Sequence, residues 1–150
     1  MLAEEEGMTV FEDVFSDAQM EMISVALEYA GNSVSDVFVQ FGILRGMRQG
    51  DCFFVKDGKT YLRHELPGVD KSIDRQRVLL HTIMEEGQRI WLAGQECDRE
   101  VPVEGYLHYH VGGAVDARYS YQDIPVGEDT QWKDKLNAWR DSVQHDLDKA

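Results

Sequence analysis

The first 44 residues of this 150-residue chain contain no Lys or Arg, although they carry nine of its 28 Asp and Glu residues. About two thirds of the net charge of −13 therefore lies in this segment. Affinity for nucleic acid comes mainly from Lys and Arg, which displace counterions from phosphates, so the charge argues against direct nucleic-acid binding. It favours either a basic protein partner, whose association the acids would accelerate, or simple solvation of the surface.

Cysteine, proline and long apolar runs are also scarce. The chain has two Cys and three Pro, and its most apolar windows, such as residues 37–43, are interrupted by charges. None approaches the roughly 20 residues that cross a bilayer, and the N-terminus has neither the basic start nor the apolar run of a secretory signal. We therefore expect a cytoplasmic protein that does not span a membrane, with Cys52 and Cys97 as free thiols.

Length and composition predict a single domain over residues 1–150. Hydrophobic residues make up 43% of the chain and aromatic residues 10%, which is typical of globular proteins. A chain of this length folds without a metal ion or a disulfide because it buries enough surface. Residues 1–8, which include three successive Glu, are expected to form a flexible tail because termini are usually poorly ordered.

The first segment with helical periodicity covers residues 16–31. Ser16 and Gln19 have the spacing of a capping box, and apolar residues then recur at steps of three and four. Gly31 suits the end of the helix because the position after a helix often needs a left-handed conformation. The sequence therefore predicts that the helix begins at Ser16.

Two further helices are expected. The one over residues 71–93 carries an apolar stripe and should be the most buried, and its Gly87 would allow a strand to approach closely. The last has Asp129 or Thr130 as its cap. Its apolar face repeats at steps of four, three, four and four: Trp132, Leu136, Trp139, Val143 and Leu147.

Alternating patterns predict five strands. The first begins near Val34 and is followed by a glycine-containing loop over residues 42–50. Asp57-Gly58 lies between the second and third strands, and Gly112-Gly113 lies between residues 103–111 and 114–121. Such pairs suit two-residue turns with positive φ, so both pairs of strands should form antiparallel hairpins.

The order of elements is therefore α-β-β-β-α-β-β-α. Hairpin connections favour a mostly antiparallel sheet of about five strands, with three helices packed against it. The predicted fold class is α+β.

Two histidines on one strand form the most suggestive chemical motif. His108 and His110 alternate, so both side chains should point to the same face, where two imidazoles can share a metal ion. A metal site needs further ligands, and His64 and Asp116 are the candidates. Without them a polar strand face is the simpler interpretation, so we assign no metal, cofactor or catalytic residue.

Acidic side chains cluster at the edge and exit of the second hairpin, where a partner protein could reach them. We take them as candidate partner-binding residues, with solvation or helix capping as the alternative, since most surface charges contribute little. They are Asp116, Asp123, Glu128 and Asp129.

Residues 101–140 resemble the C-terminal half of small bacterial immunity and antitoxin proteins of polymorphic toxin systems, in particular the YezG-like family. The similarity comprises an alternating strand, a Gly turn, a second strand ending Tyr-Ser-Tyr-Gln-Asp at residues 119–123, and a helix carrying Trp132 and Trp139. The chain is divergent, because family members tend to place an Arg upstream of the last Trp, whereas here Arg140 follows it.

The resemblance implies an immunity protein without enzymatic activity, which binds and blocks a cognate toxin, often a nuclease. An acidic surface fits that role, since a nuclease that grips phosphate tends to be basic. Two alternatives remain open: a small metal-dependent enzyme using His108 and His110, or an acidic adaptor or chaperone for a secreted effector. The sequence does not determine the oligomeric state.

Overall fold

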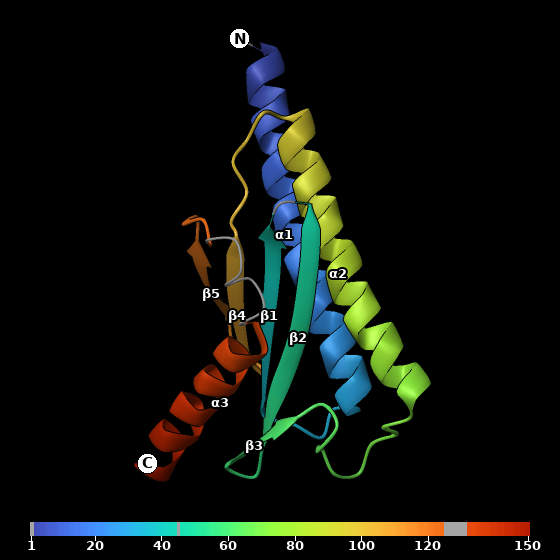
Figure 1. Ribbon diagram of the computed structural model, residues 1–150, viewed down its shortest axis with the longest axis vertical. Helices are drawn as coiled ribbons and strands as arrows, with labels where there is room; N and C mark the ends of the chain where they lie inside the picture. The colour runs from blue at the N-terminus through green and yellow to red at the C-terminus, as the bar shows by residue number, and fades with distance from the viewer. Residues whose placement is uncertain (1, 45, 125–131) are drawn as a thin grey trace.

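The computed structural model describes residues 2–44, 46–124 and 132–150. These residues form three helices and one five-stranded sheet in which all neighbouring strands are antiparallel (Figure 1). The predicted α+β class and the predicted order of elements are confirmed. The helices are α1 (Leu2–Ala30), α2 (Ile73–Glu96) and α3 (Trp132–Asp148).

The sheet has the strand order β3-β2-β1-β4-β5, so β1 lies at its centre and β5 at one edge. Helices α1 and α2 cover one face, and α3 lies on the opposite face across the lower part of the sheet (Figure 1). The molecule therefore has three layers. Its strands are β1 (Asp36–Leu44), β2 (Met47–Lys56), β3 (Lys59–Leu62), β4 (Glu104–His110) and β5 (Val115–Ser120).

Helix α1 is longer than its sequence pattern predicts. It begins at Leu2, so Ser16 lies inside the helix and the predicted cap there is wrong. The backbone of residues 2–8, where we expected a tail, is helical. Beyond the sheet the helix is supported by α2 and the loop after it: Phe11 is only 3% exposed, and the guanidinium of Arg99 lies 4.8 Å from its ring centre.

The predicted loop over residues 42–50 is also wrong, because β1 and β2 continue through most of it and pair up to Leu44 and Met47. Two glycines of these strands lie where other elements approach the sheet. The indole of Trp132 lies over Gly42, and Ile83 of α2 lies against Gly50, so that a Cβ at either glycine would collide. Glycine inside a strand often marks such a close approach.

Both predicted hairpins are present, but only the first has a two-residue turn, because residues 110–114 separate the last pair of β4 and β5. Asp57 and Gly58 have φ of 51° and 78°, the positive values that a tight turn between β2 and β3 requires. Gly112 has φ of 87° in the turn between β4 and β5.

The two faces of β1 belong to two different cores. Val37, Val39 and Phe41 lie in the larger core under α1 and α2, whereas Phe38 lies in a smaller core under α3. Helix α2 buries Leu79, Ile83 and Ile90, whereas Ile73 in its first turn is 73% exposed.

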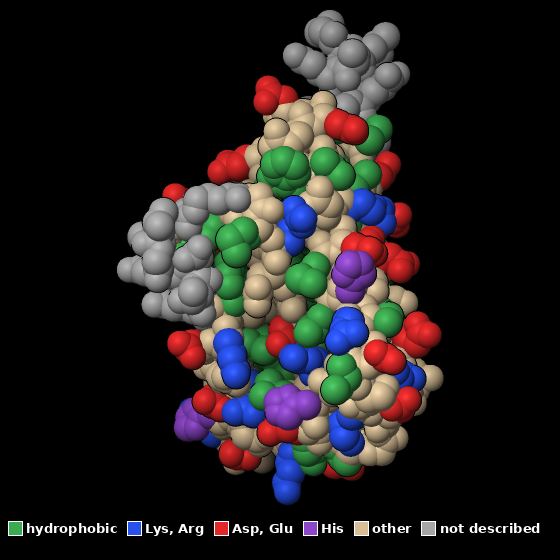
Figure 2. Space-filling model, turned by 45° about the vertical axis from the view of Figure 1, so that its right-hand side comes forward, with side chains coloured by type: hydrophobic (Ala, Val, Ile, Leu, Met, Phe, Trp, Pro, Cys, Tyr) green, Lys and Arg blue, Asp and Glu red, His purple; other side chains and the backbone are tan. Residues whose placement is uncertain are grey.

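None of the helices in the described residues combines the length and apolar character needed to cross a bilayer. Five acids of the N-terminal segment are exposed on α1: Glu12, Asp13, Asp17, Glu21 and Glu28. On the face seen in Figure 2, Lys and Arg gather in the lower half among acids, while the upper half carries mainly acids.

Candidate functional site

An aromatic cluster holds α3 on the sheet. The indole of Trp139 meets the rings of Phe38, Phe53 and Tyr106 edge-on, with ring centres 5.1–5.4 Å apart. Edge-to-face contacts of this kind stabilise beyond the area that they bury. The strict apolar spacing of α3 thus points one side of the helix at β1 and β2, as its sequence predicts.

Polar contacts fix the position of α3 along the sheet. Lys135 pairs with the buried carboxylate of Glu104 at 2.5 Å, and the hydroxyl of Tyr106 donates to the same carboxylate at 3.3 Å. Burial raises the pKa of Tyr106. Near the other end of the helix, Oε1 of Gln144 accepts the backbone N–H of Thr60 at 2.8 Å. The helix is thereby anchored to both β4 and β3.

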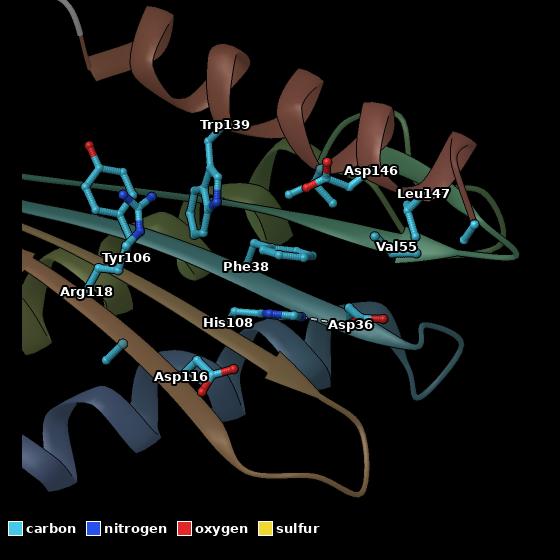
Figure 3. Close-up of a pocket in the computed structure, with 13 residues that line it drawn as sticks. Asp36, Phe38, Val55, Tyr106, His108, Asp116, Arg118, Trp139, Asp146 and Leu147 are labelled. Atoms are coloured by element: carbon cyan, nitrogen blue, oxygen red, sulfur yellow. Dashed lines mark hydrogen bonds and ion pairs between the residues drawn. The ribbon is translucent and has the colours of Figure 1, made fainter.

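Between α3 and strands β1, β4 and β5 lies a groove of about 460 Å³, which we call the α3 groove (Figure 3). Its charged residues are Asp36, Asp116, Arg118 and Asp146. The remaining surface is mainly apolar or aromatic, and it includes Phe38, Val55, Tyr106, Trp139, Val143 and Leu147. An apolar groove with a few charged groups is the usual form of a binding site.

Asp36 is the centre of a hydrogen-bonded cluster in this groove. Its Oδ2 lies 2.7 Å from Nε2 of His108 and 3.2 Å from Nδ1 of His110, and its Oδ1 accepts the hydroxyl of Ser35 at 2.7 Å. Burial alone would raise the pKa of Asp36, but the hydrogen bonds from His108, Ser35 and His110 outweigh it and lower that pKa. An ionised carboxylate only accepts, so both ring nitrogens that face it carry a proton.

The ring of His108 is also fixed by stacking. It lies parallel to Phe38 at 4.2 Å, and Phe38 stacks on Phe53 at 4.5 Å. Trp139 approaches from α3 above this stack, as Figure 3 shows. The imidazole is therefore held on one face by an aromatic ring and at Nε2 by Asp36, and it forms part of a rigid wall.

Two other carboxylates of the α3 groove are available to a partner. Asp116 belongs to β5 and Asp146 to α3, so they line the groove from opposite walls, and both are exposed (Figure 3). Neither forms an ion pair within the described part of the chain. The one Arg of the groove, Arg118, lies 4.6 Å from the ring centre of Tyr106.

The predicted partner-binding residues fall in different places. Asp116 lies in the α3 groove, whereas Asp123 lies in the coil after β5, where its carboxylate accepts the backbone N–H of Ile124 at 2.9 Å. Glu128 and Asp129, and with them the predicted cap of α3, lie outside the described residues. The sequence analysis missed Asp36 and Asp146. Asp146 follows Val143 on the helix face that borders the groove, and that spacing was the available signal.

The histidine prediction is confirmed in its geometry, since His108 and His110 lie on one side of β4 and share Asp36. The suggested third ligand His64 follows β3, at the other end of the sheet, and lines a different pocket. Nowhere in the described residues do three or more His, Cys, Asp or Glu side chains come together in a way that fits a metal ion.

The same geometry does not assemble a nucleophile. Ser35 is the hydroxyl in this cluster, and it donates to Asp36 rather than facing His108. Cys52 is fully buried, and burial raises the pKa of its thiol well above the ordinary value. What the groove offers is an aromatic surface with carboxylates beside it, which can bind a cationic side chain by charge and by contact with ring faces.

Comparison with family models and with curated proteins gives no match for this sequence.

Proposed function

We propose that this chain is an immunity protein of the bacterial cytoplasm, which binds a cognate basic toxin domain, such as a nuclease, and blocks it without catalysing a reaction. The observation that carries the proposal is the pair of exposed carboxylates, Asp116 and Asp146, on opposite walls of an aromatic groove. A Lys or Arg of the partner that enters the groove can pair with one of these carboxylates, and its stem can lie against the aromatic lining.

The overall charge supports the same role. A net charge of −13 attracts a basic protein from a distance and speeds its association, while specificity comes from a few buried contacts. The acids along α1 add to this steering field. A nuclease covered by this surface would lose access to its substrate, because both phosphate and this protein bind to the same basic residues.

The resemblance of residues 101–140 to YezG-like immunity proteins points in the same direction. In the structure these residues supply β4, β5 and the first half of α3, and with them six of the residues that line the α3 groove. The similarity therefore covers Asp116 on one wall of the groove, whereas Asp146 on the other wall lies outside it.

The test is titration of the purified protein with the toxin domain encoded next to its gene, followed by an assay of toxin activity. We expect a stoichiometric complex, inhibition of the toxin, and an association rate that falls as salt increases. No complex at any salt concentration would rule out the proposal. A complex that leaves the toxin active would instead favour the adaptor or chaperone alternative.

A pair of double variants separates groove contacts from overall charge. The variant D116N/D146N removes both groove carboxylates, and D134N/D141N removes two other exposed acids of α3, so both change the net charge by the same amount. We expect the first to weaken the complex at least tenfold and the second by less than threefold, since surface charges outside contacts act mainly by steering. Equal effects would show that only net charge matters.

The metal-dependent enzyme, our other alternative, has its own test. Elemental analysis of the purified protein, with and without chelator, would detect a stoichiometric metal ion held by His108 and His110. Bound metal that stabilises the fold would favour that alternative over the immunity role.

A further inference from the structure

Strand β5 is an open edge of the sheet. In the described part of the chain it pairs with β4 on one side and with no strand on the other. Asp116 and Arg118 on one face of the strand and Ala117 and Tyr119 on the other are exposed, so both faces of β5 are accessible. An accessible edge presents unpaired backbone groups that can accept a further strand.

The register shows which peptide groups of β4 face β1. The N–H of Val111 donates to the carbonyl of Ser35, and the N–H of Ile43 donates to the carbonyl of Val103. Along an antiparallel strand the peptide groups of successive residues point alternately to the two sides. Odd-numbered residues of β4 therefore bond to β1, and even-numbered residues bond to β5.

The same alternation assigns the peptide groups of β5. His108 pairs with Asp116 and Tyr106 with Arg118, so Asp116 and Arg118 direct their backbone groups towards β4. The N–H and C=O groups of Val115, Ala117 and Tyr119 consequently point away from the sheet. They form a row of donors and acceptors with the spacing that an added strand requires.

A groove lies on each face of this edge. Asp116 and Arg118 point towards the α3 groove. On the other face is a second groove of about 420 Å³, which we call the α1 groove. Its apolar and aromatic residues come from α1, from β5 and from the coil after β5: Phe11, Phe15, Met20, Ala117, Tyr119 and Tyr121.

The α1 groove has a mixed surface, in which Glu12, Ser16, Gln19 and Arg99 lie among the apolar and aromatic residues, and its aromatic part is held in place. Tyr119 meets Phe15 edge-on at 5.3 Å, and its hydroxyl donates to Oε1 of Gln19 at 2.5 Å, which fixes the ring. Met20 and Tyr121 are 50% and 47% exposed, so their apolar surface faces solvent. A strand added beside β5 would cover part of it.

We propose that β5 accepts an extended segment of the basic partner as a sixth strand of the sheet. Side chains of such a strand alternate between its faces, so the segment carries Lys or Arg towards the α3 groove and apolar residues towards the α1 groove. This inference rests on the proposed function, and it specifies the kind of partner segment that binds: an extended strand with alternating basic and apolar residues. Charge complementarity selects this occupant, because the α3 side presents Asp116 and Asp146.

The charge pattern of β5 also fixes the register of the added strand. Directly opposite charges across a strand pair stabilise it and like charges destabilise it. A basic residue of the partner therefore lies beside Asp116 rather than beside Arg118. The guanidinium of Arg118 lies over the ring of Tyr106. Among the described residues it forms no ion pair with Asp116.

A synthetic peptide tests the edge without the toxin. The probe is the amidated peptide Thr-Val-Lys-Val-Thr-Val-Thr, whose single Lys can lie beside Asp116 with a Thr beside Arg118. Its control is Thr-Thr-Val-Val-Val-Lys-Thr, which has the same composition and charge but does not alternate. Binding is measured by titration calorimetry and by amide hydrogen exchange. We expect the probe to bind at least tenfold more tightly than the control and to protect the amides of Val115, Ala117 and Tyr119. Protection of Asp116 and Arg118 should not change, because their N–H groups are already bonded to β4.

Two variants check the backbone and the charge separately. A117P removes an outward N–H and leaves the ladder to β4 intact, a placement that edge strands tolerate. We expect it to weaken probe binding at least tenfold, with an unchanged circular dichroism spectrum and unfolding midpoint. D116K should weaken binding of the probe several-fold, whereas D141K, which makes the same charge change outside both grooves, should have a smaller effect.

No binding of the probe at up to about 1 mM would overturn the inference. So would equal binding of the two peptides, or binding that A117P does not weaken although the variant is folded. The outcomes of the two proposals are distinguishable: inhibition of the toxin without probe binding rejects only the added strand, and probe binding without toxin inhibition rejects only the immunity role.

Discussion

Asp36 and His108 join the first strand of the sheet to the fourth, with Oδ2 of Asp36 only 2.7 Å from Nε2 of His108 although 72 residues separate them. His110 adds a second contact to the same oxygen. This cluster orients the two histidines that the sequence places on one face of a strand. It forms one wall of the α3 groove, where its structural role can be measured.

Replacing Asp36 by Asn should destabilise the protein at neutral pH. The carboxylate is 16% exposed and accepts three hydrogen bonds, so we expect a loss of about 1.5 to 3 kcal/mol in the free energy of unfolding. The folded protein lowers the pKa of Asp36 below its ordinary value of 3.8. Its contribution is therefore present above that pH and is lost as the pH falls through the lowered pKa.

Urea unfolding of the wild type and D36N at pH 7 and at pH 3 measures both effects. The difference between the two proteins should shrink in acid. D141N, which removes an exposed acid from α3, should change the stability by less than about 0.5 kcal/mol. Equal stability of D36N and wild type at pH 7 would contradict a stabilising role for the hydrogen bonds that Asp36 accepts.

Two Gly-to-Ala variants should have opposite effects. A Cβ at Gly50 of β2 collides with Ile83, so G50A should destabilise by about 1 to 3 kcal/mol. At Gly87 of α2 the added Cβ would lie 3.9 Å from Ile43, an ordinary contact, and Ala favours the helix by up to about 1 kcal/mol. Thermal unfolding of both variants tests the prediction, and a neutral G50A would mean that α2 does not contact β2 at this point.

Trp139 should be the main apolar anchor of α3. W139A removes its contacts with Phe38, Phe53 and Tyr106, and we expect a loss of about 3 kcal/mol together with a weaker near-ultraviolet dichroism signal. W139F keeps one ring in the cluster and should lose less than half as much. If W139A unfolds like wild type, the smaller core contributes little to stability.

The two thiols should differ sharply in reactivity. Cys52 is buried and burial raises the pKa of its thiol, whereas Cys97 at the end of α2 is partly exposed. Because the thiolate is the reactive form, a thiol reagent at pH 8 should titrate one cysteine quickly in the native protein and both after denaturation. C97S should abolish the fast reaction. Two fast equivalents in the wild type would contradict the burial of Cys52.

The local patterns of the sequence predicted most of the elements correctly. The turn at Asp57-Gly58 was predictable because its residues accept positive φ, and the face of α3 was predictable from the spacing of Trp132 to Leu147. The positions of two glycines inside strands were not predictable. Gly42 and Gly50 resemble loop residues until Trp132 and Ile83 are seen to pack on them.

The candidate site was predictable only in part. Alternation correctly placed His108 and His110 on one side of a strand, but their partner Asp36 comes from another strand, through the pairing of Asp36 with His110. Asp116 was selected for its charge and its place beside a hairpin. Asp146, on the opposite wall, shares a helix face with Val143, but that this face borders the groove depends on where α3 packs on the sheet.

The sequence by itself determined the order of the elements, the presence of both hairpins and the acidic character of the surface, because each of these depends on residues close together in the chain or on composition alone. The tertiary structure decided the length of α1, the continuation of β1 and β2 through their glycines, and the two grooves beside β5. These features depend on contacts between segments that are distant in the chain. The free energy of such contacts outweighs the local preferences of the residues, and the contacts themselves can be identified only once the strand register is known.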